Sequence, residues 1–171
     1  MIRDAVLSPD KVFRYSLSRV WAPERGCVGF GMLNPSTADH ERDDPTIKRC
    51  IHFANYWGYG ELVVVNAFAL RATNPDDLDK TYWSPVGADN DAAIISAISK
   101  SKLFVAAWGN ILGKFPDRFV AMQQLLAGIP LHHLGLTQLG HPRHPLYVKG
   151  TMKPTLWTTG GFMSNPERRT L

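Results

Sequence analysis

Four short apolar runs, each ending in a polar or glycine-rich turn, constrain the fold of this chain more than any other feature of its sequence. The runs are residues 27–33, 62–68, 103–109 and 130–136. Continuous apolar runs of this length are typical of β-strands that are buried on both faces. Such strands need a covering layer on each side, so the segments between the runs indicate the fold class.

Helical patterns occupy the three intervals between the runs. Residues 45–56 begin after Asp44, a residue type that caps helices well, with a proline at the first helical position. Residues 88–99 and 116–126 are the other two predicted helices. Strands that alternate with helices indicate a parallel sheet between helical layers. The predicted fold class is therefore α/β, a three-layer α/β/α sandwich with a four-stranded, mainly parallel central sheet.

The segment before the first run predicts a further strand. Residues 12–21 alternate in polarity, with Phe13, Tyr15 and Leu17 on one side and Arg19 as a candidate for the same side. We expect this strand at an edge of the sheet.

Length and composition limit the class of protein further. The 171 residues are 44% hydrophobic and 20% charged, which excludes disordered, collagen-like and disulfide-framework proteins. No repeat or linker divides the chain, so residues 1–171 are expected to form one domain. The longest apolar stretch, residues 62–70, is too short for a membrane span, and the N-terminus does not resemble a signal peptide. We expect Cys27 and Cys50 to be reduced thiols of a cytoplasmic protein.

The sequence predicts no metal ion and no cofactor. His132 and His133 are adjacent in a predicted strand, so their side chains face opposite ways. The chain has neither a phosphate-binding P-loop nor the glycine fingerprint of dinucleotide-binding proteins.

The net charge is concentrated at one end of the chain. Residues 141–171 contain five basic residues and one acidic residue, a balance of +4 that equals the formal net charge of the whole chain. These residues are Arg143, Lys149, Lys153, Arg168, Arg169 and Glu167. A basic region of this kind is either a polyanion-binding surface or a solvated tail.

Polar side chains follow the predicted strands at the points where the strands end. Asn34, Pro35 and Ser36 follow the first strand, Asn66 lies in the second, and Trp108 ends the third. His141, Pro142 and Arg143 follow the fourth strand. Each of these residues alone is an ordinary turn or loop residue. Because ligands of parallel sheets bind outside the carboxyl ends of the strands, their recurrence there predicts a binding cleft.

The order of these four motifs resembles that of the uracil-DNA glycosylase superfamily. The resemblance covers residues 27–148 and rests on Asn34-Pro35-Ser36, Val65-Asn66-Ala67, Ala107-Trp108-Gly109 and His141-Pro142-Arg143. Residues 33–39 also look like a bacterial and phage family of uncharacterised domains. The resemblance implies a monofunctional DNA N-glycosylase, which hydrolyses the N-glycosidic bond of a base that has been flipped out of the duplex.

The resemblance also implies roles for individual residues. Asn34 would position the attacking water, because its amide orients a water molecule but does not ionise. Asp39 is either a supplementary carboxylate or a cap of the following segment. His141 would donate a hydrogen bond to the departing base, and Asn66 would recognise the base edge.

Ser36 departs from the pattern of the uracil-specific members, which the resemblance implies carry a bulky aromatic residue at this position. A small serine leaves room beside C5 of the pyrimidine. The expected substrate is therefore a 5-modified or mismatched pyrimidine rather than uracil alone, in repair or in defence against phages.

The basic end of the chain supplies the expected DNA contacts. Arg143, His144 and Lys149 would bind phosphates, and Leu146 either fills the gap left by the flipped base or packs under its loop. The aromatic that stacks on the base is one of Phe53, Trp57, Phe68 and Trp108, of which we select Phe68 and Trp108.

The leading prediction is therefore a monomeric hydrolase whose partner is DNA. Two alternatives stay open. One is a binding module with the same fold that recognises a modified base without cleaving it. The other is an N-glycosidase that acts on free nucleosides or nucleotides.

Overall fold

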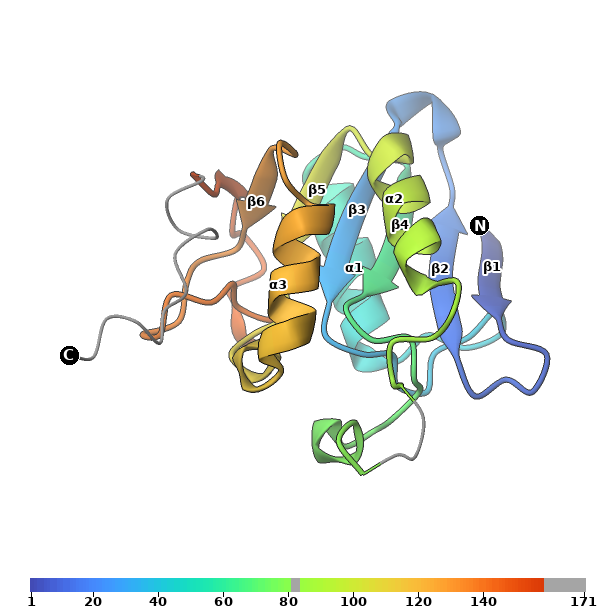
Figure 1. Cartoon of the computed structure of the whole chain (residues 1–171). Coiled ribbons are helices and arrows are strands. Elements are labelled where there is room, and N and C mark those ends of the chain that lie inside the picture. The colour runs from blue at the N-terminus through green and yellow to red at the C-terminus, as the bar shows by residue number, and fades with distance from the viewer. Residues whose placement is uncertain (81–83, 159–171) are drawn as a thin grey trace.

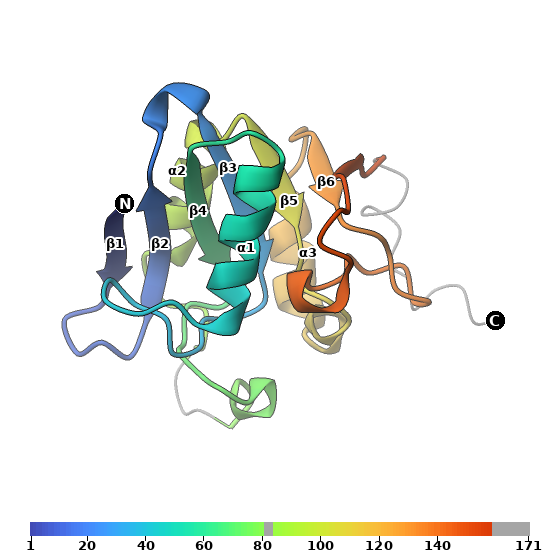
Figure 2. The ribbon, with the colours of Figure 1, turned by 180° about the vertical axis from the view of Figure 1, so that it is seen from behind.

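The computed structural model describes residues 1–80 and 84–158, in which a central β-sheet lies between helices (Figures 1 and 2). The strands are β1 (Ile2–Leu7), β2 (Arg14–Val20), β3 (Cys27–Met32), β4 (Glu61–Asn66), β5 (Leu103–Ala106), β6 (Leu131–His133) and β7 (Thr155–Leu156). The α-helices are α1 (Pro45–Tyr56), α2 (Asn90–Lys100) and α3 (Pro116–Leu125). Four short 3₁₀ helices are described as well: η1 (Pro23–Arg25), η2 (Pro75–Asp77), η3 (Ile111–Lys114) and η4 (Pro145–Tyr147).

The sheet is mixed, with the strand order β1-β2-β4-β3-β5-β6-β7. The four strands β4, β3, β5 and β6 are parallel, and each lies almost entirely within one of the four apolar runs. The strands β1, β2 and β7 add antiparallel pairings at the two sides. The α/β class is confirmed, but the predicted four-stranded, mainly parallel sheet is wrong, because the sheet in the described residues has seven strands and three of its six strand pairings are antiparallel. β1 and β7 escaped prediction because they are largely exposed and have no continuous apolar run.

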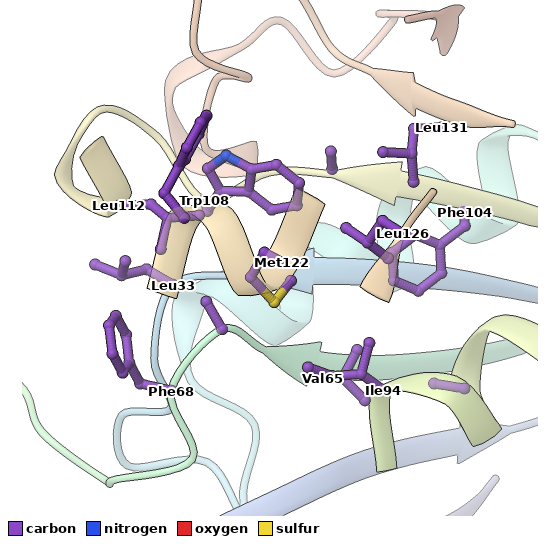
Figure 3. Packing of buried hydrophobic residues seen from close by; sticks show 14 of the residues in the cluster. Leu33, Val65, Phe68, Ile94, Phe104, Trp108, Leu112, Met122, Leu126 and Leu131 are labelled. Carbon is purple, nitrogen blue, oxygen red and sulfur yellow. The ribbon is translucent and has the colours of Figure 1, made fainter. Parts of the chain in front are cut away.

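Helices cover both faces of the sheet. Figure 1 shows α2 and α3 in front of the strands, and Figure 2 shows α1 on the opposite face. On the α1 face, Phe30 and Val64 of the sheet pack with Ile47 and Phe53 of the helix. The other face has its own core, in which Figure 3 shows Trp108 and Leu33 at one end and Phe104 at the other.

Local sequence signals explain where the helices begin. The Asp44 side chain accepts a hydrogen bond from the backbone N–H of Ile47 at 2.8 Å, and Pro45 takes the first helical position of α1. α2 begins at Asn90, two residues later than predicted. The buried Asn90 amide donates to the carbonyl oxygens of Asn66 and Ala67, which ties this helix to the end of β4.

β2 differs from its prediction in two ways: its place in the sheet, and the face of the sheet on which its side chains lie. It lies inside the sheet, because β1 pairs with its outer edge. Val6 and Leu7 of β1 pair with Ser16 and Arg14, so Tyr15 is an extra residue in β2. The expected grouping of Tyr15 with Leu17 is therefore wrong.

The bulge at Tyr15 turns Arg14 to the α1 face. Leu17 belongs to the core of that face, and both Arg14 and Arg19 bind the loop between β3 and α1. Without the extra residue, Arg14 and Arg19 would face opposite sides of the sheet.

Candidate functional site

A cleft of about 970 Å³ lies at the carboxyl ends of the parallel strands. It forms where the adjacent strands β3 and β5 send their chains to opposite sides: β3 leads to α1 on one face, and β5 leads to α3 on the other. The diverging loops leave a crevice, which is the usual ligand site of open α/β sheets. Residues 137–147, which follow β6, form the third wall.

Five of the residues selected from the sequence line this cleft. They are Asn34, Ser36, Trp108, Arg143 and His144. Their elements are far apart in the chain, and the parallel sheet brings them together. Trp108 contributes only a small part of its ring, because it is 2% exposed and packs against Trp157 at a centroid distance of 5.9 Å.

The other selected residues do not line the cleft. They are Asp39, Asn66, Phe68, His141, Leu146 and Lys149. Phe68 is buried in the core, where its ring meets Phe115 edge to face at 4.8 Å. Leu146 and Lys149 are exposed, in η4 and just after it.

The Asp39 carboxylate forms hydrogen bonds within its own loop. It accepts hydrogen bonds from the backbone N–H groups of Glu41 at 2.8 Å and Arg42 at 2.9 Å. The bonds from Arg42 and Glu41 lower the pKa of Asp39 below its ordinary value. Of the two alternatives for Asp39, the structure therefore favours the cap.

The orientation of the Asn34 amide follows from its hydrogen bonds. Its Nδ2 donates to the carbonyl oxygen of Ala72 at 2.7 Å and to that of Pro35 at 3.2 Å. With the nitrogen held by backbone oxygens, Oδ1 is the atom left to accept a hydrogen bond from a ligand or a water molecule.

His141 lies in the wall behind the cleft. Its ring meets Phe119 edge to face at 6.1 Å, and its Nε2 would be 3.2 Å from a Cβ atom at Gly113. Its backbone N–H donates to the Oγ1 of Thr137, a cleft residue. The imidazole therefore sits between η3 and α3, and its role as a base contact stays a prediction.

His144 is the histidine that faces the cleft. Its Nδ1 accepts a hydrogen bond from the backbone N–H of Leu146 at 3.4 Å, so a neutral ring carries its proton on Nε2. Burial lowers the pKa of His144, and Asp44 opposes this shift. A neutral imidazole with an Nε2–H is a hydrogen-bond donor to a departing oxyanion. The sequence signal was available, because His144 precedes a proline just as His141 does.

Arg14 is the main cleft residue that sequence reasoning missed. It lines the cleft although its side chain is 2% exposed, because the bulge in β2 points it toward the loop after β3. Its Nη1 donates to the carbonyl oxygen of Ala38 at 2.7 Å, whereas its buried Nε has no hydrogen-bond partner among the described residues. A pattern of alternating polarity does not reveal a bulge. The available sequence signal for a buried Arg14 was an arginine at the first position of a predicted strand.

The basic residues near the C-terminus are only partly in the cleft. Arg143 lines it, whereas Lys149 and Lys153 are exposed outside the lining. Arg168 and Arg169 lie outside the described residues, as does Glu167.

No group of three or more His, Cys, Asp or Glu side chains in residues 1–80 and 84–158 is arranged to hold a metal ion. None of the helices in the same ranges has the length and apolar character needed to cross a membrane.

The chain was compared with known protein families, curated proteins and solved structures. Residues 14–146 match the model of a family described as "Protein of unknown function (DUF1643)". No curated protein and no solved structure matches the chain. The matched range begins at Arg14 and ends shortly after His144, so it contains the cleft residues discussed above.

Proposed function

The chain belongs to the DUF1643 family, and we propose that it is a DNA N-glycosidase that removes a flipped, 5-modified pyrimidine. The observation that carries this proposal is the cleft at the switch point of the sheet. Asn34 and Ser36 line this cleft together with Arg143 and His144, which come from the segment after β6. The resemblance of the strand-end motifs to those of the uracil-DNA glycosylase superfamily supports the same proposal.

Asn34 and His144 divide the chemistry between them. The Oδ1 of Asn34 accepts a hydrogen bond from water and orients it toward the anomeric carbon of the sugar. As the C–N bond breaks, the sugar gains the hydroxyl of water, and the base leaves with the bonding electrons and takes up the proton. His144 donates its Nε2–H to the oxygen of the base as negative charge develops there. We assign this donor role to His144 because the ring of His141 does not line the cleft.

Ser36 makes room for the modification. Its side chain is small and half-buried at the cleft wall, beside Asn34. A substituent at C5 of a pyrimidine held by Asn34 fits beside a serine, whereas a bulky aromatic would exclude it.

The mouth of the cleft carries the proposed DNA contacts. Tyr147 is 77% exposed and Leu139 is 60% exposed, and both line the cleft. Their apolar surfaces suit the gap that a flipped base leaves in the stack. The exposed Arg143 beside them would bind a phosphate, a contact that weakens as salt concentration rises.

The test is incubation of the purified protein with duplex oligonucleotides that carry a panel of 5-modified pyrimidines or uracil. Alkali converts each abasic site to a strand break, which is measured on a denaturing gel. We expect breaks at one or more 5-modified bases. The N34A variant should lose most of this activity, and the N55A variant should retain it. Asn55 is a matched control because it is exposed on α1 and outside the cleft.

Ser36→Tyr sharpens the same test. The tyrosine should abolish removal of the modified base while leaving the protein folded. Ready removal of plain uracil with no activity on any 5-modified base would contradict the assignment of Ser36. Shifted DNA mobility without breaks would identify a binding module, and activity on monomers alone would identify a nucleoside N-glycosidase.

A further inference from the structure

Two buried side chains with unpaired polar atoms come from neighbouring segments of the sheet, and one of them, Arg14, lines the cleft. Arg14 is 2% exposed with its Nε unpaired, and Asn66 is 1% exposed with neither Oδ1 nor Nδ2 paired within the described part of the chain. An unpaired buried polar atom is costly, and native proteins contain few of them. Three such atoms on two side chains of neighbouring strands are therefore candidates for binding a ligand.

The two side chains come from neighbouring strands. β2 and β4 pair with Leu17 opposite Val64, and the backbone N–H of Arg14 donates to the carbonyl oxygen of Ala69 at 2.9 Å. Asn66, the last residue of β4, lies between Val64 and Ala69 in the chain.

Both side chains are also on the α1 side of the sheet. Asn66 is paired with Met32, which lines the cleft and belongs to the α1-face core. Strand alternation places Asn66 on the face of Val64, which is in the same core. Arg14 binds Ala38 of that core.

The charge of Arg14 is not neutralised by a salt bridge. No carboxylate of the described residues lies within 4.0 Å of its guanidinium. The nearest acidic influences are Asp44 and Asp39, and Arg71 and Arg19 oppose them. Burial lowers the pKa of Arg14 to about 10, so the side chain is still a cation at neutral pH.

We propose that Arg14, with Asn66 beside it, forms a buried subsite for an oxyanion, a carboxylate or a phosphate, carried by the substrate. A planar guanidinium with a free Nε–H suits the oxygens of either group. The inference deepens the proposed function and rests on it for the choice of pyrimidine probes. The oxyanion is either a substituent on the base or the phosphate of its nucleotide.

Two pairs of small probes distinguish these sources. One pair is 5-carboxy-2′-deoxyuridine and thymidine, which differ in charge on the base. The other is 2′-deoxyuridine 5′-monophosphate and 2′-deoxyuridine, which differ in the phosphate. Affinity is measured by NMR titration of the ¹⁵N-labelled protein, with the tryptophan indole resonances and the arginine Nε–H resonances as probes.

We expect the anionic member of one pair to bind about tenfold or more tightly than its neutral partner, with a shift of the Arg14 Nε–H resonance. Arg14→Gln should lose this preference, and Arg42→Gln should keep it, because Arg42 is exposed and outside the cleft. Arg14→Lys, which keeps the charge without the planar fork, should show a reduced preference.

Equal binding of the charged and neutral members of both pairs by the wild-type protein would overturn the subsite, as would a preference that survives in Arg14→Gln. The wild-type comparison decides the question even if Arg14→Gln does not fold. These probes require neither DNA binding nor bond cleavage. A failed subsite and a failed glycosidase therefore give different results.

Discussion

The two ends of β2 carry buried arginines with opposite surroundings. Arg19 is 0% exposed and uses all three of its nitrogens: they bind Asp43 at 2.7 and 2.8 Å and the carbonyl oxygens of Asp4, Ser18 and Asp39. Arg14 is 2% exposed, and its guanidinium has one hydrogen-bond partner within the described ranges, the carbonyl oxygen of Ala38. Both bind the same loop between β3 and α1. Arg19, whose guanidinium nitrogens are all hydrogen-bonded, is a structural clamp for this loop. Arg14, whose Nε is unpaired in the described residues, lines the cleft.

Arg19→Met should have the largest effect on stability. It leaves the carboxylate of Asp43, which is 8% exposed, with only the partly exposed Arg3 at 3.2 Å as its ion-pair partner, and it removes the anchor of the loop. We expect the free energy of unfolding to fall by about 3–5 kcal/mol, as measured by urea denaturation. Arg25→Met is the control, because Arg25 is exposed and its salt bridge to Glu24 is on the surface. A loss as small as that of the control would mean that Arg19 is not a clamp.

Asn34→Ala tests the function of the cleft that Arg14 lines, and its readout is activity. Without its amide the attacking water is no longer oriented, and we expect the cleavage rate to fall by about 10²-fold. The loss of the hydrogen bond to Ala72 should lower stability by only about 1 kcal/mol. A single-turnover assay on modified DNA, together with urea denaturation, separates the two effects. Unchanged cleavage in a folded variant would remove Asn34 from the mechanism.

Arg14→Met should change stability much less than Arg19→Met. The substitution removes one hydrogen bond, to Ala38, and also removes a buried cation that has no ion-pair partner in residues 1–80 and 84–158. These effects oppose one another, so we expect a change of about 1 kcal/mol in the free energy of unfolding. A loss equal to that of Arg19→Met would make both arginines structural and would break the comparison.

Acid should affect the two regions in different pH ranges. The pKa of His144 in the cleft is lowered from its ordinary 6.5, so its contribution to stability is present above that value. It is lost as pH falls through the lower folded value, because the unfolded chain takes up the proton first. The pKa of Asp39, in the loop that Arg19 holds, is lowered from 3.8, so its contribution is lost only in stronger acid.

Urea denaturation at a series of pH values measures this difference. His144→Gln should flatten the pH dependence of stability below 6.5, and Asp39→Asn should flatten it below 3.8. This change in pH dependence should be the smallest of the four predicted effects. A steeper pH dependence in His144→Gln than in the wild-type protein would contradict the assigned direction.

Local patterns were sufficient for much of the fold. The cap at Asp44 with Pro45 after it predicted the bounds of α1 correctly, because these residues satisfy or remove the free N–H groups of the first turn. The apolar runs predicted the four parallel strands, because burial on both faces requires apolar side chains at every position. The exposed strand β1 carries no such requirement and was missed.

The sequence predicted where the cleft lies but not all of the residues that line it. Asn34 and Ser36 follow a strand directly, so the rule that ligands bind at strand ends selected them. His141 and His144 both precede prolines, and the backbone path after β6 determines that His144 faces the cleft. Asp39 was ambiguous because a turn and a catalytic site both favour a carboxylate.

The sequence by itself therefore determined the apolar strands, the helix starts and the edge of the sheet at which polar residues gather, because each of these depends on neighbours within a few residues. Only the tertiary structure decided which buried polar groups are satisfied. Arg14 and Arg19 have the same chemistry and lie on the same strand. One extra residue at Tyr15 turns Arg14 to the side of Arg19, and the folded loop opposite satisfies Arg19 fully and Arg14 only in part.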